Sequence, residues 1–251
     1  MRFLKVTTFY EDYLSQLYGR RPALATMPYG EQQRALLWDC FGWADFFQNE
    51  LTPLGYDATE LVINAEPLQR AWASEHGIAF PAIDWPHEIA FEQIRRINPE
   101  ILFLDDTPKF PLAWIERVRA HCPSLRLLLG WSGAPSPPSE AIAAYDAILS
   151  CVPELVAGFA ERGKKAFHLN HGFDARVLER IDVSRPATLG LSFVGQILGG
   201  SEFHEERRRM LLRLSELFDL GIYSPTSEVS LRGRIKQRLK PALRPVAAAL
   251  D

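Results

Sequence analysis

Residues 101–129 read ILFLDDTPKFPLAWIERVRAHCPSLRLLL, in which two short apolar runs flank a longer amphipathic segment. The runs ILFL at 101–104 and LRLLL at 125–129 are nearly continuous in apolar residues, which is typical of strands buried on both faces of a parallel sheet. The residues between them are interpreted as a helix over 111–121. A strand, a helix and a strand in this order form a βαβ unit, so this segment predicts an α/β protein.

The same alternation continues on both sides of this segment. Further strands are expected at 2–8, 59–63, 147–149 and 166–169, and further helices at 31–51, 67–75, 86–97, 139–145 and 153–162. We therefore expect an α/β fold with a Rossmann-like parallel sheet, covered by helices on both faces, in a first domain over residues 1–186.

A second domain is expected to begin after the break at residues 184–188. An apolar strand over 189–194 is followed by the glycine loop Gly195–Gly200, a helix over 202–218 and a strand over 221–223. Because this βαβ unit is begun but not completed, we expect residues 187–251 to be the start of a second Rossmann-like domain that is truncated in this sequence.

The composition excludes several classes of protein. With 251 residues, 47% of them hydrophobic, the chain is too apolar to be disordered and too long to need disulfides. The 28 basic and 31 acidic residues give a net charge of -3, so we expect no nucleic-acid binding. Cys40, Cys122 and Cys151 lack metal-ligand spacing, and neither a signal peptide nor the roughly 18 uninterrupted apolar residues of a membrane span occur. These features predict a cytoplasmic protein.

The C-terminal segment departs from this charge balance. Residues 229–250 include six basic side chains and no acidic one. Apolar residues recur between them every four positions, at Leu231, Ile235, Leu239 and Leu243. We interpret this amphipathic segment as a solvent-exposed connecting helix close to the truncation point. Contact with an anionic donor, or weak contact with an anionic membrane surface, are the alternatives.

The side chains that directly follow the predicted strands are the candidates for ligand contact, because open α/β sheets bind ligands beyond the carboxyl ends of their strands. They include Tyr10, Asp12, Tyr13, Asp105, Asp106, Trp131, His171 and Asp174. Aromatic rings stack on sugar faces and carboxylates accept hydrogen bonds from hydroxyls, so this set suits a hydroxyl-rich ligand. The alternative for each acidic residue is that it caps a helix.

Gly195 and Gln196 open a loop between a strand and a helix, where backbone N–H groups and a helix N-terminus can bind a phosphate. The loop matches neither the dinucleotide-binding fingerprint nor the P-loop, so a plain turn is the alternative. His204 and Arg207 are three residues apart and share one face of the expected helix, from which both can reach a diphosphate. The alternative is that they form a solvent-exposed charged face, because Arg207, Arg208 and Arg209 are consecutive and cannot all face a ligand.

Motifs of other enzyme classes are missing from the sequence. There is no G-x-S-x-G nucleophile motif, no cysteine with a plausibly paired histidine, and no H-E-x-x-H or D-x-D-x-D-G array. The six histidines are dispersed along the chain. A hydrolase or a metalloenzyme is therefore disfavoured, and we expect no bound metal.

Three longer strings are more specific. GEQQRALL at 30–37, DCFGWADF at 39–46 and NAEPLQRAW at 64–72 resemble the N-terminal half of CgeB-like bacterial glycosyltransferases. LNHGFD at 169–174 looks like the hinge-side strand end of GT-B enzymes, and LSFVG at 191–195 looks like the first strand and glycine turn of their donor domain. The resemblance spans nearly all of the chain.

The resemblance implies two facing Rossmann-like domains, of which the first takes an acceptor and the second a nucleotide-diphosphate sugar. That sugar nucleotide is a co-substrate, and no cofactor is implied. Candidates for positioning the acceptor hydroxyl and removing its proton are Asp106, Asp12 and His171. Candidates for stabilising the leaving diphosphate are Gly195, Gln196, His204 and Arg207.

Members of this family continue with the rest of the donor domain, so we expect the sequence to be a fragment of a longer protein. A second chain that supplies the remainder is the alternative. The alternative to a transferase is a non-catalytic Rossmann-like module that binds a glycan or a protein partner. A nucleotide-binding oxidoreductase is disfavoured, because residues 7–10 (TTFY) stand where the dinucleotide fingerprint would follow the first strand.

Overall fold

The computed structural model describes residues 1–135, 139–182, 184–197 and 202–224 of the chain. It divides into two compact units, Met1–Val177 and Leu178–Asp251, which are called unit 1 and unit 2 and are each described by itself. The sequence places the boundary slightly later, after Pro186. The basic segment 229–250, with its expected helix and its donor or membrane contacts, lies outside the described residues.

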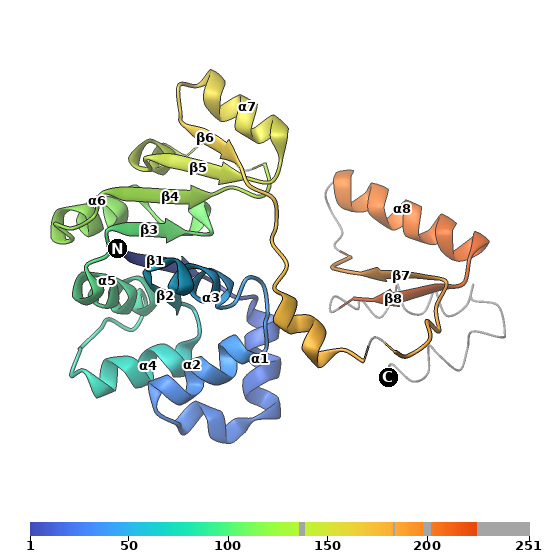
Figure 1. Ribbon diagram of the computed structural model, residues 1–251, viewed down its shortest axis with the longest axis horizontal. Helices are drawn as coiled ribbons and strands as arrows, with labels where there is room; N and C mark the ends of the chain where they lie inside the picture. Colours follow the sequence, from blue (N-terminus) through green and yellow to red (C-terminus); the bar gives the residue numbers. More distant parts are fainter. Residues whose placement is uncertain (136–138, 183, 198–201, 225–251) are drawn as a thin grey trace. The chain divides into compact units, whose positions relative to one another are not determined.

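Unit 1 is built on a six-stranded sheet with the order β2-β1-β3-β4-β5-β6. All of its pairings are parallel, so the carboxyl ends of the strands lie at one edge (Figure 1). The strands are β1 (Arg2–Thr7), β2 (Asp57–Val62), β3 (Ile101–Leu104), β4 (Leu127–Trp131), β5 (Ala147–Ser150) and β6 (Ala166–His168). The predicted α/β class, with a Rossmann-like parallel sheet, is confirmed.

Helices connect these strands. The α-helices of unit 1 are α1 (Glu11–Arg20), α2 (Tyr29–Trp38), α3 (Phe46–Leu51), α4 (Glu66–Glu75), α5 (Trp85–Ile97), α6 (Leu112–His121) and α7 (Pro153–Glu161). Shorter 3-10 helices are η1 (Pro22–Thr26), η2 (Thr52–Leu54), η3 (Thr107–Lys109), η4 (Glu140–Ala144) and η5 (Ala175–Arg180). Pro86 and Pro153 lie in the first turns of α5 and α7. The N–H groups of a first turn have no hydrogen-bond partner within the helix, so the missing N–H of proline costs no hydrogen bond there.

The single helix expected over 31–51 is wrong. It is divided into α2 and α3 by a loop over 39–45, because Cys40, Gly42 and Ala44 have φ values of 53°, 60° and 35°. A right-handed helix contains no residue with positive φ. The apolar residues whose spacing predicted one helix belong to two helices and to the strained loop between them.

Two further differences concern neighbouring segments. The helix expected over 139–145 is only the 3-10 helix η4. Ser139 caps its N-terminus, because its Oγ accepts a hydrogen bond from the N–H of Ala141 at 3.2 Å. Helix α1 is missing from the sequence-based prediction. Its mostly polar sequence buries only Leu14 and Leu17, so the apolar spacing there is weak.

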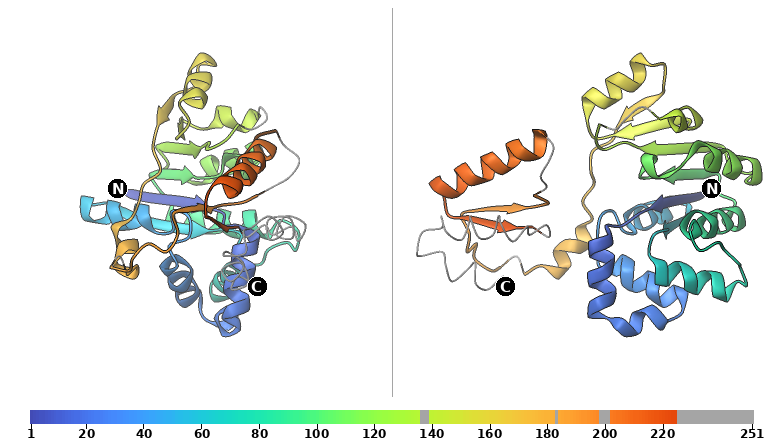
Figure 2. Two further views of the ribbon diagram at one scale, coloured as in Figure 1. Left: turned by 90° about the vertical axis from the view of Figure 1, so that its right-hand side faces the viewer. Right: turned by 180° about the vertical axis from the view of Figure 1, so that it is seen from behind.

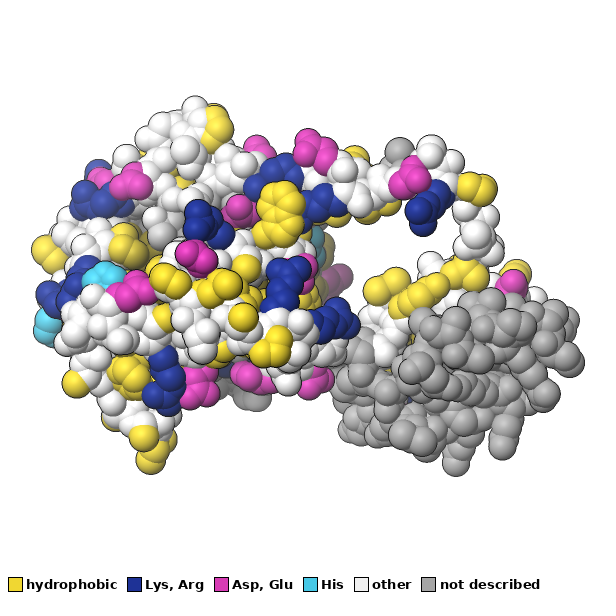
Figure 3. All heavy atoms as spheres, turned by 90° about the horizontal axis from the view of Figure 1, so that it is seen from below, with side chains coloured by type: hydrophobic (Ala, Val, Ile, Leu, Met, Phe, Trp, Pro, Cys, Tyr) yellow, Lys and Arg dark blue, Asp and Glu magenta, His cyan; other side chains and the backbone are white. Residues whose placement is uncertain are grey.

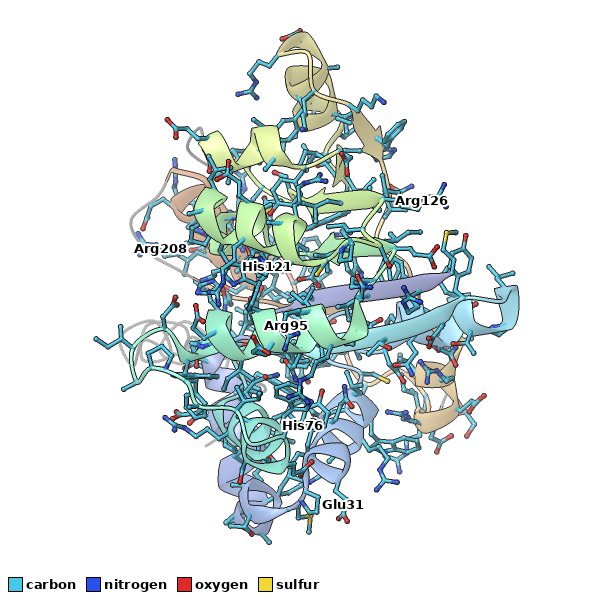
Figure 4. The ribbon with its side chains drawn as sticks, turned by 90° about the vertical axis from the view of Figure 1, so that its left-hand side faces the viewer. Glu31, His76, Arg95, His121, Arg126 and Arg208 are labelled. Carbon is cyan, nitrogen blue, oxygen red and sulfur yellow. The ribbon has the colours of Figure 1, made fainter. Side chains whose placement is uncertain are left out.

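The sheet has helices on both faces (Figure 2). On one face, strand residues such as Leu102 and Leu128 pack with Ile94 of α5 and Ile115 of α6. Figure 4 shows α5 and α6 side by side on this face, with Arg95 on α5 and His121 at the end of α6. The opposite face is rich in aromatic residues from β1, β3, β4, α3 and the loop 39–45, namely Phe3, Trp43, Phe47, Phe103 and Trp131.

Unit 2 contains a second βαβ arrangement, made of β7 (Leu191–Val194), α8 (Glu202–Leu217) and β8 (Leu220–Tyr223). β7 and β8 pair in parallel, and Ile197, Leu211 and Leu220 form their buried core. The elements predicted for this region are therefore present as far as Tyr223. Within the ranges that the structure describes, no helix combines the length and the apolar character that a membrane span requires.

Candidate functional site

The winding of the chain reverses between β1 and β3, which are neighbours in the sheet although β2 lies between them in the sequence. Ligands of open α/β sheets bind at such a point, beyond the carboxyl ends of the strands. Two loops meet there: Oγ1 of Thr8, after β1, donates a hydrogen bond to Oδ2 of Asp106, after β3, at 3.1 Å. Asp106 is half-buried, so its carboxylate is held in place and still reaches the surface.

Asp105 has different surroundings from its neighbour Asp106. Burial raises the pKa of Asp105 to about 6, while the ammonium of Lys5 and a hydrogen bond from Thr7 act in the opposite direction. We therefore group Asp105 with the buried charges of β1 and β2 and not with the Thr8–Asp106 pair.

Lys5 and Glu60 form an ion pair inside the protein. Nζ of Lys5 lies 2.9 Å from Oε2 of Glu60, and the two side chains are 1% and 0% exposed. Burial raises the pKa of Glu60 to about 7, against the opposing effect of Lys5. The same ammonium donates a hydrogen bond to the main-chain oxygen of Ala44 at 3.0 Å. One buried cation thus joins β1, β2 and the loop 39–45.

Three rings meet beside this loop. Trp43 lies edge-to-face against Trp131 with ring centroids 4.7 Å apart, and His171 lies 5.3 Å from each of them. Trp131 is buried and His171 is exposed. The structure therefore brings together two residues that the sequence predicted as separate candidates, around a tryptophan that sequence reasoning did not single out for a site.

Arg176 connects the same loop to the end of unit 1. Its Nη2 lies 2.8 Å from Oδ1 of Asp45 and 2.6 Å from Oδ2 of Asp174. Its Nε lies 3.0 Å from both carboxylate oxygens of Asp174, whose side chain is only 2% exposed. These contacts give Asp174 a structural role close to His171.

Tyr10, Asp12 and Tyr13 lie together at the start of α1. Tyr10 is 61% exposed, and Asp12 is exposed as well. The ring of Tyr13 stacks on Phe41 with centroids 3.9 Å apart, and its hydroxyl donates to Oδ2 of Asp39 at 2.9 Å. Because Phe41 and Asp39 belong to the loop 39–45, this loop contacts both groups of predicted rings.

In unit 2, the structure brings Arg207 to the glycine loop. Nη1 of Arg207 donates a hydrogen bond to the main-chain oxygen of Gln196 at 3.1 Å. His204 is half-buried one turn earlier on α8. The N–H of Gly195 donates to the carbonyl oxygen of Tyr223 at 3.0 Å, so it extends the β7–β8 pairing. The remainder of the loop, residues 198–200, lies outside the described residues.

Sequence reasoning missed Lys5, Trp43 and Arg176. Lys5 carries a signal, because a lysine in the middle of the apolar strand RFLKVT needs a buried partner. Arg176 carries no such signal, since its partner Asp45 is 131 positions away. Across the described ranges, no three His, Cys, Asp or Glu side chains are grouped as a metal site requires.

These features define the class of protein: an α/β protein with a doubly wound parallel sheet and a candidate site at its carboxyl edge. Neither a protein-family model nor a curated protein matches the chain. Among solved structures, it is similar to a glycosyltransferase from Rickettsia africae ESF-5, with a TM-score of 0.47 and 11% sequence identity. The match covers 94% of this chain and 64% of that chain, so this chain spans less than two thirds of the other.

Proposed function

We propose that this protein is a glycosyltransferase of the GT-B type, related to the CgeB-like enzymes, which transfers a sugar from a nucleotide-diphosphate donor to a hydroxyl-bearing acceptor. Unit 1 binds the acceptor and unit 2 contributes to donor binding. The resemblance of the strings at 30–37, 39–46 and 64–72 supports the family. A cytoplasmic location belongs to the same proposal.

The observation that carries the proposal is the Thr8–Asp106 hydrogen bond at the point where the sheet reverses its winding. It holds a half-buried carboxylate where this class of sheet binds its ligands. Trp131 ends β4 and His171 follows β6, and Trp43 packs against both rings from the loop 39–45. A carboxylate beside aromatic rings suits a sugar, which offers hydroxyl donors and an apolar ring face.

In the reaction, Asp106 accepts the proton of the acceptor hydroxyl while the oxygen of that hydroxyl forms a bond to the anomeric carbon of the donor. The bond from this carbon to the diphosphate breaks, and the electron pair leaves with the diphosphate. Asp12 and His171 are the other candidates for the proton. Tyr10, Tyr13 and Trp131 contact the acceptor, for which Asp105 and Asp174 also remain candidates.

At the donor end, Arg207 neutralises the charge of the leaving diphosphate, and His204 and the loop from Gly195 assist it. The bond from Arg207 to Gln196 supports this role, because it places the guanidinium beside the loop. Arg209, two positions further on the same helix, is exposed and donates to the main-chain oxygen of Glu205 at 3.4 Å. Arg209 is therefore a matched control for the loss of one positive charge.

Titration calorimetry with UDP-glucose, UDP-N-acetylglucosamine and GDP-mannose tests the proposal. We expect one of these to bind, Arg207→Ala to weaken that binding by at least about tenfold, and Arg209→Ala to leave it nearly unchanged. Equal affinities of the wild type and Arg207→Ala would remove Arg207 from the donor site. Binding of simple saccharides without any sugar nucleotide would favour the alternative, a non-catalytic glycan-binding module.

The partners in this proposal are the sugar nucleotide and the acceptor, with no nucleic acid. Basic and acidic side chains interleave on the face of unit 1 drawn in Figure 3, which supports this view. A nucleic-acid surface gathers basic side chains on one face.

A further inference from the structure

The loop 39–45 contains an unusual backbone. Cys40 and Ala44 have φ values of 53° and 35°, and Gly42 lies between them at 60°. Non-glycine residues in this region are strained and persist only where surrounding contacts hold them. The conformation of this loop therefore requires stabilising contacts with the rest of the protein.

In the described part of the chain, side chains from three other segments make polar contacts with the loop at Asp39, Ala44 and Asp45. The hydroxyl of Tyr13 donates to Asp39 at 2.9 Å, and Arg176 pairs with Asp45 at 2.8 Å. Between them, Nζ of Lys5 donates to the main-chain oxygen of the strained Ala44 at 3.0 Å. The Lys5 contact is the most protected, because its side chain is 1% exposed and Ala44 is fully buried.

A buried lysine in the centre of a strand is unfavourable for the stability of the fold. Removing an ammonium from water is unfavourable, and a buried ion pair can often be replaced by apolar residues without loss of stability. Glu60 is one partner of Lys5, and the carboxyl of Asp105 also interacts with its charge. The bond to Ala44 is different, because it reaches out of the sheet to a loop that carries Trp43.

We propose that Lys5 is a positioning residue, whose ammonium fixes the loop 39–45 so that Trp43 forms one wall of the acceptor site. Trp43 lies edge-to-face against Trp131 at 4.7 Å and within 5.3 Å of His171. Nζ of Lys5 also lies 5.9 Å from the centre of the Trp43 ring. The acceptor part of this inference rests on the proposed function, whereas the part about the loop does not.

The effect of Lys5 on the loop can be separated from its pairing with Glu60. Glu60→Gln removes the buried negative charge, keeps an oxygen for the N–H of Gln48, and leaves Lys5 free to bind Ala44. Lys5→Met in the Glu60→Gln background then removes the bond to Ala44 without leaving Glu60 unpaired. The comparison of these two variants measures what the Lys5 ammonium does for the loop apart from its pairing with Glu60.

The readout is the exciton couplet that two close indoles give in far-ultraviolet circular dichroism, which Trp43→Phe and Trp131→Phe identify. We expect Glu60→Gln to keep the couplet and Lys5→Met/Glu60→Gln to lose at least half of it, with a cooperative unfolding transition retained. Should this double variant fail to fold, Lys5→Gln/Glu60→Gln keeps a shorter donor, and we expect a smaller loss of the same sign. A folded double variant with the full couplet would overturn the proposal.

Acceptor binding is measured separately, by titrating methyl β-D-glucopyranoside, methyl β-D-galactopyranoside and methyl N-acetyl-β-D-glucosaminide. We expect the double variant to bind at least about tenfold more weakly than Glu60→Gln. Equal binding by these two variants would refute the acceptor part. If none of the glycosides binds the wild type, the proposed acceptor site fails, while the couplet still decides whether Lys5 positions the loop.

Discussion

Arg176 pairs with Asp45, 131 positions earlier, through two hydrogen bonds of 2.8 and 3.2 Å. The same guanidinium holds Asp174, so it ties the loop 39–45 to the segment that ends unit 1. Because Trp43 lies in this loop and His171 in this segment, the ion pair fixes the distance between two rings of the candidate site.

Arg176→Ala is expected to lower the free energy of unfolding of unit 1 by about 2 kcal/mol. The side chain of Asp174 is 2% exposed, and the substitution leaves it without this cation. Arg95→Ala is the control, because Arg95 forms a surface pair with Glu92 on the outer face of α5 (Figure 4). Urea denaturation measures both, and equal losses in the two variants would contradict a special role for Arg176.

The stability of the protein should fall as the pH rises through the range set by Glu60. Its pKa rises from the ordinary 4.5 to about 7, mainly through burial. Between these values the folded protein binds a proton that the unfolded chain releases, so folding is favoured at the acidic end and loses this advantage above about 7. The pKa of Asp105, which rises from 3.8 to about 6, changes the stability in the same direction at lower pH.

Glu60→Gln removes the first of these two groups and serves as the comparison. Denaturant titrations across this pH range should give a smaller decrease in stability for the variant than for the wild type. Parallel curves for the two proteins would mean that Glu60 keeps its ordinary pKa, in spite of its burial beside Lys5.

The strands were the most predictable part of the fold. Runs such as ILFL at 101–104 are apolar because their strand is covered on both faces, and this depends only on local sequence. The break between α2 and α3 was not predictable in this way. Apolar residues continue at helical spacing through the loop 39–45, which has positive φ values. The side chains that contact this loop, Lys5 and Arg176, come from distant parts of the sequence.

The candidate site was predictable in part for the same reason. Asp106 lies two residues beyond β3 and Trp131 is the last residue of β4, so the sheet topology alone brings them to one edge. Thr8, which binds Asp106, also follows a strand and could have been included. Trp43 reaches the site from a loop between two helices, a position that no strand-end rule indicates.

Gly130 is predicted to tolerate no side chain. A Cβ atom at this position of β4 would lie 2.6 Å from Cγ2 of Thr107 and 2.8 Å from the ring of Tyr145. Gly130→Ala should therefore destabilise the protein by about 1–3 kcal/mol. Gly19→Ala in α1 is the matched control, since its Cβ meets nothing within 4 Å and alanine favours the helix by up to about 1 kcal/mol. Thermal unfolding of the two variants should move in opposite directions, and a Gly130→Ala protein as stable as the wild type would contradict this packing.

Asp106→Asn is predicted to reduce the proposed sugar transfer by at least about a hundredfold while leaving the affinity for the sugar nucleotide unchanged. The amide can still accept the hydrogen bond from Thr8, so the loops after β1 and β3 stay joined, but it cannot take a proton from the acceptor. Asp12→Asn, in the exposed first turn of α1, removes a charge of the same kind and should have a much smaller effect. Initial rates with the donor that binds in calorimetry measure both variants. If Asp12→Asn abolishes transfer and Asp106→Asn does not, the base is Asp12, and the carboxylate held by Thr8 has a structural role only.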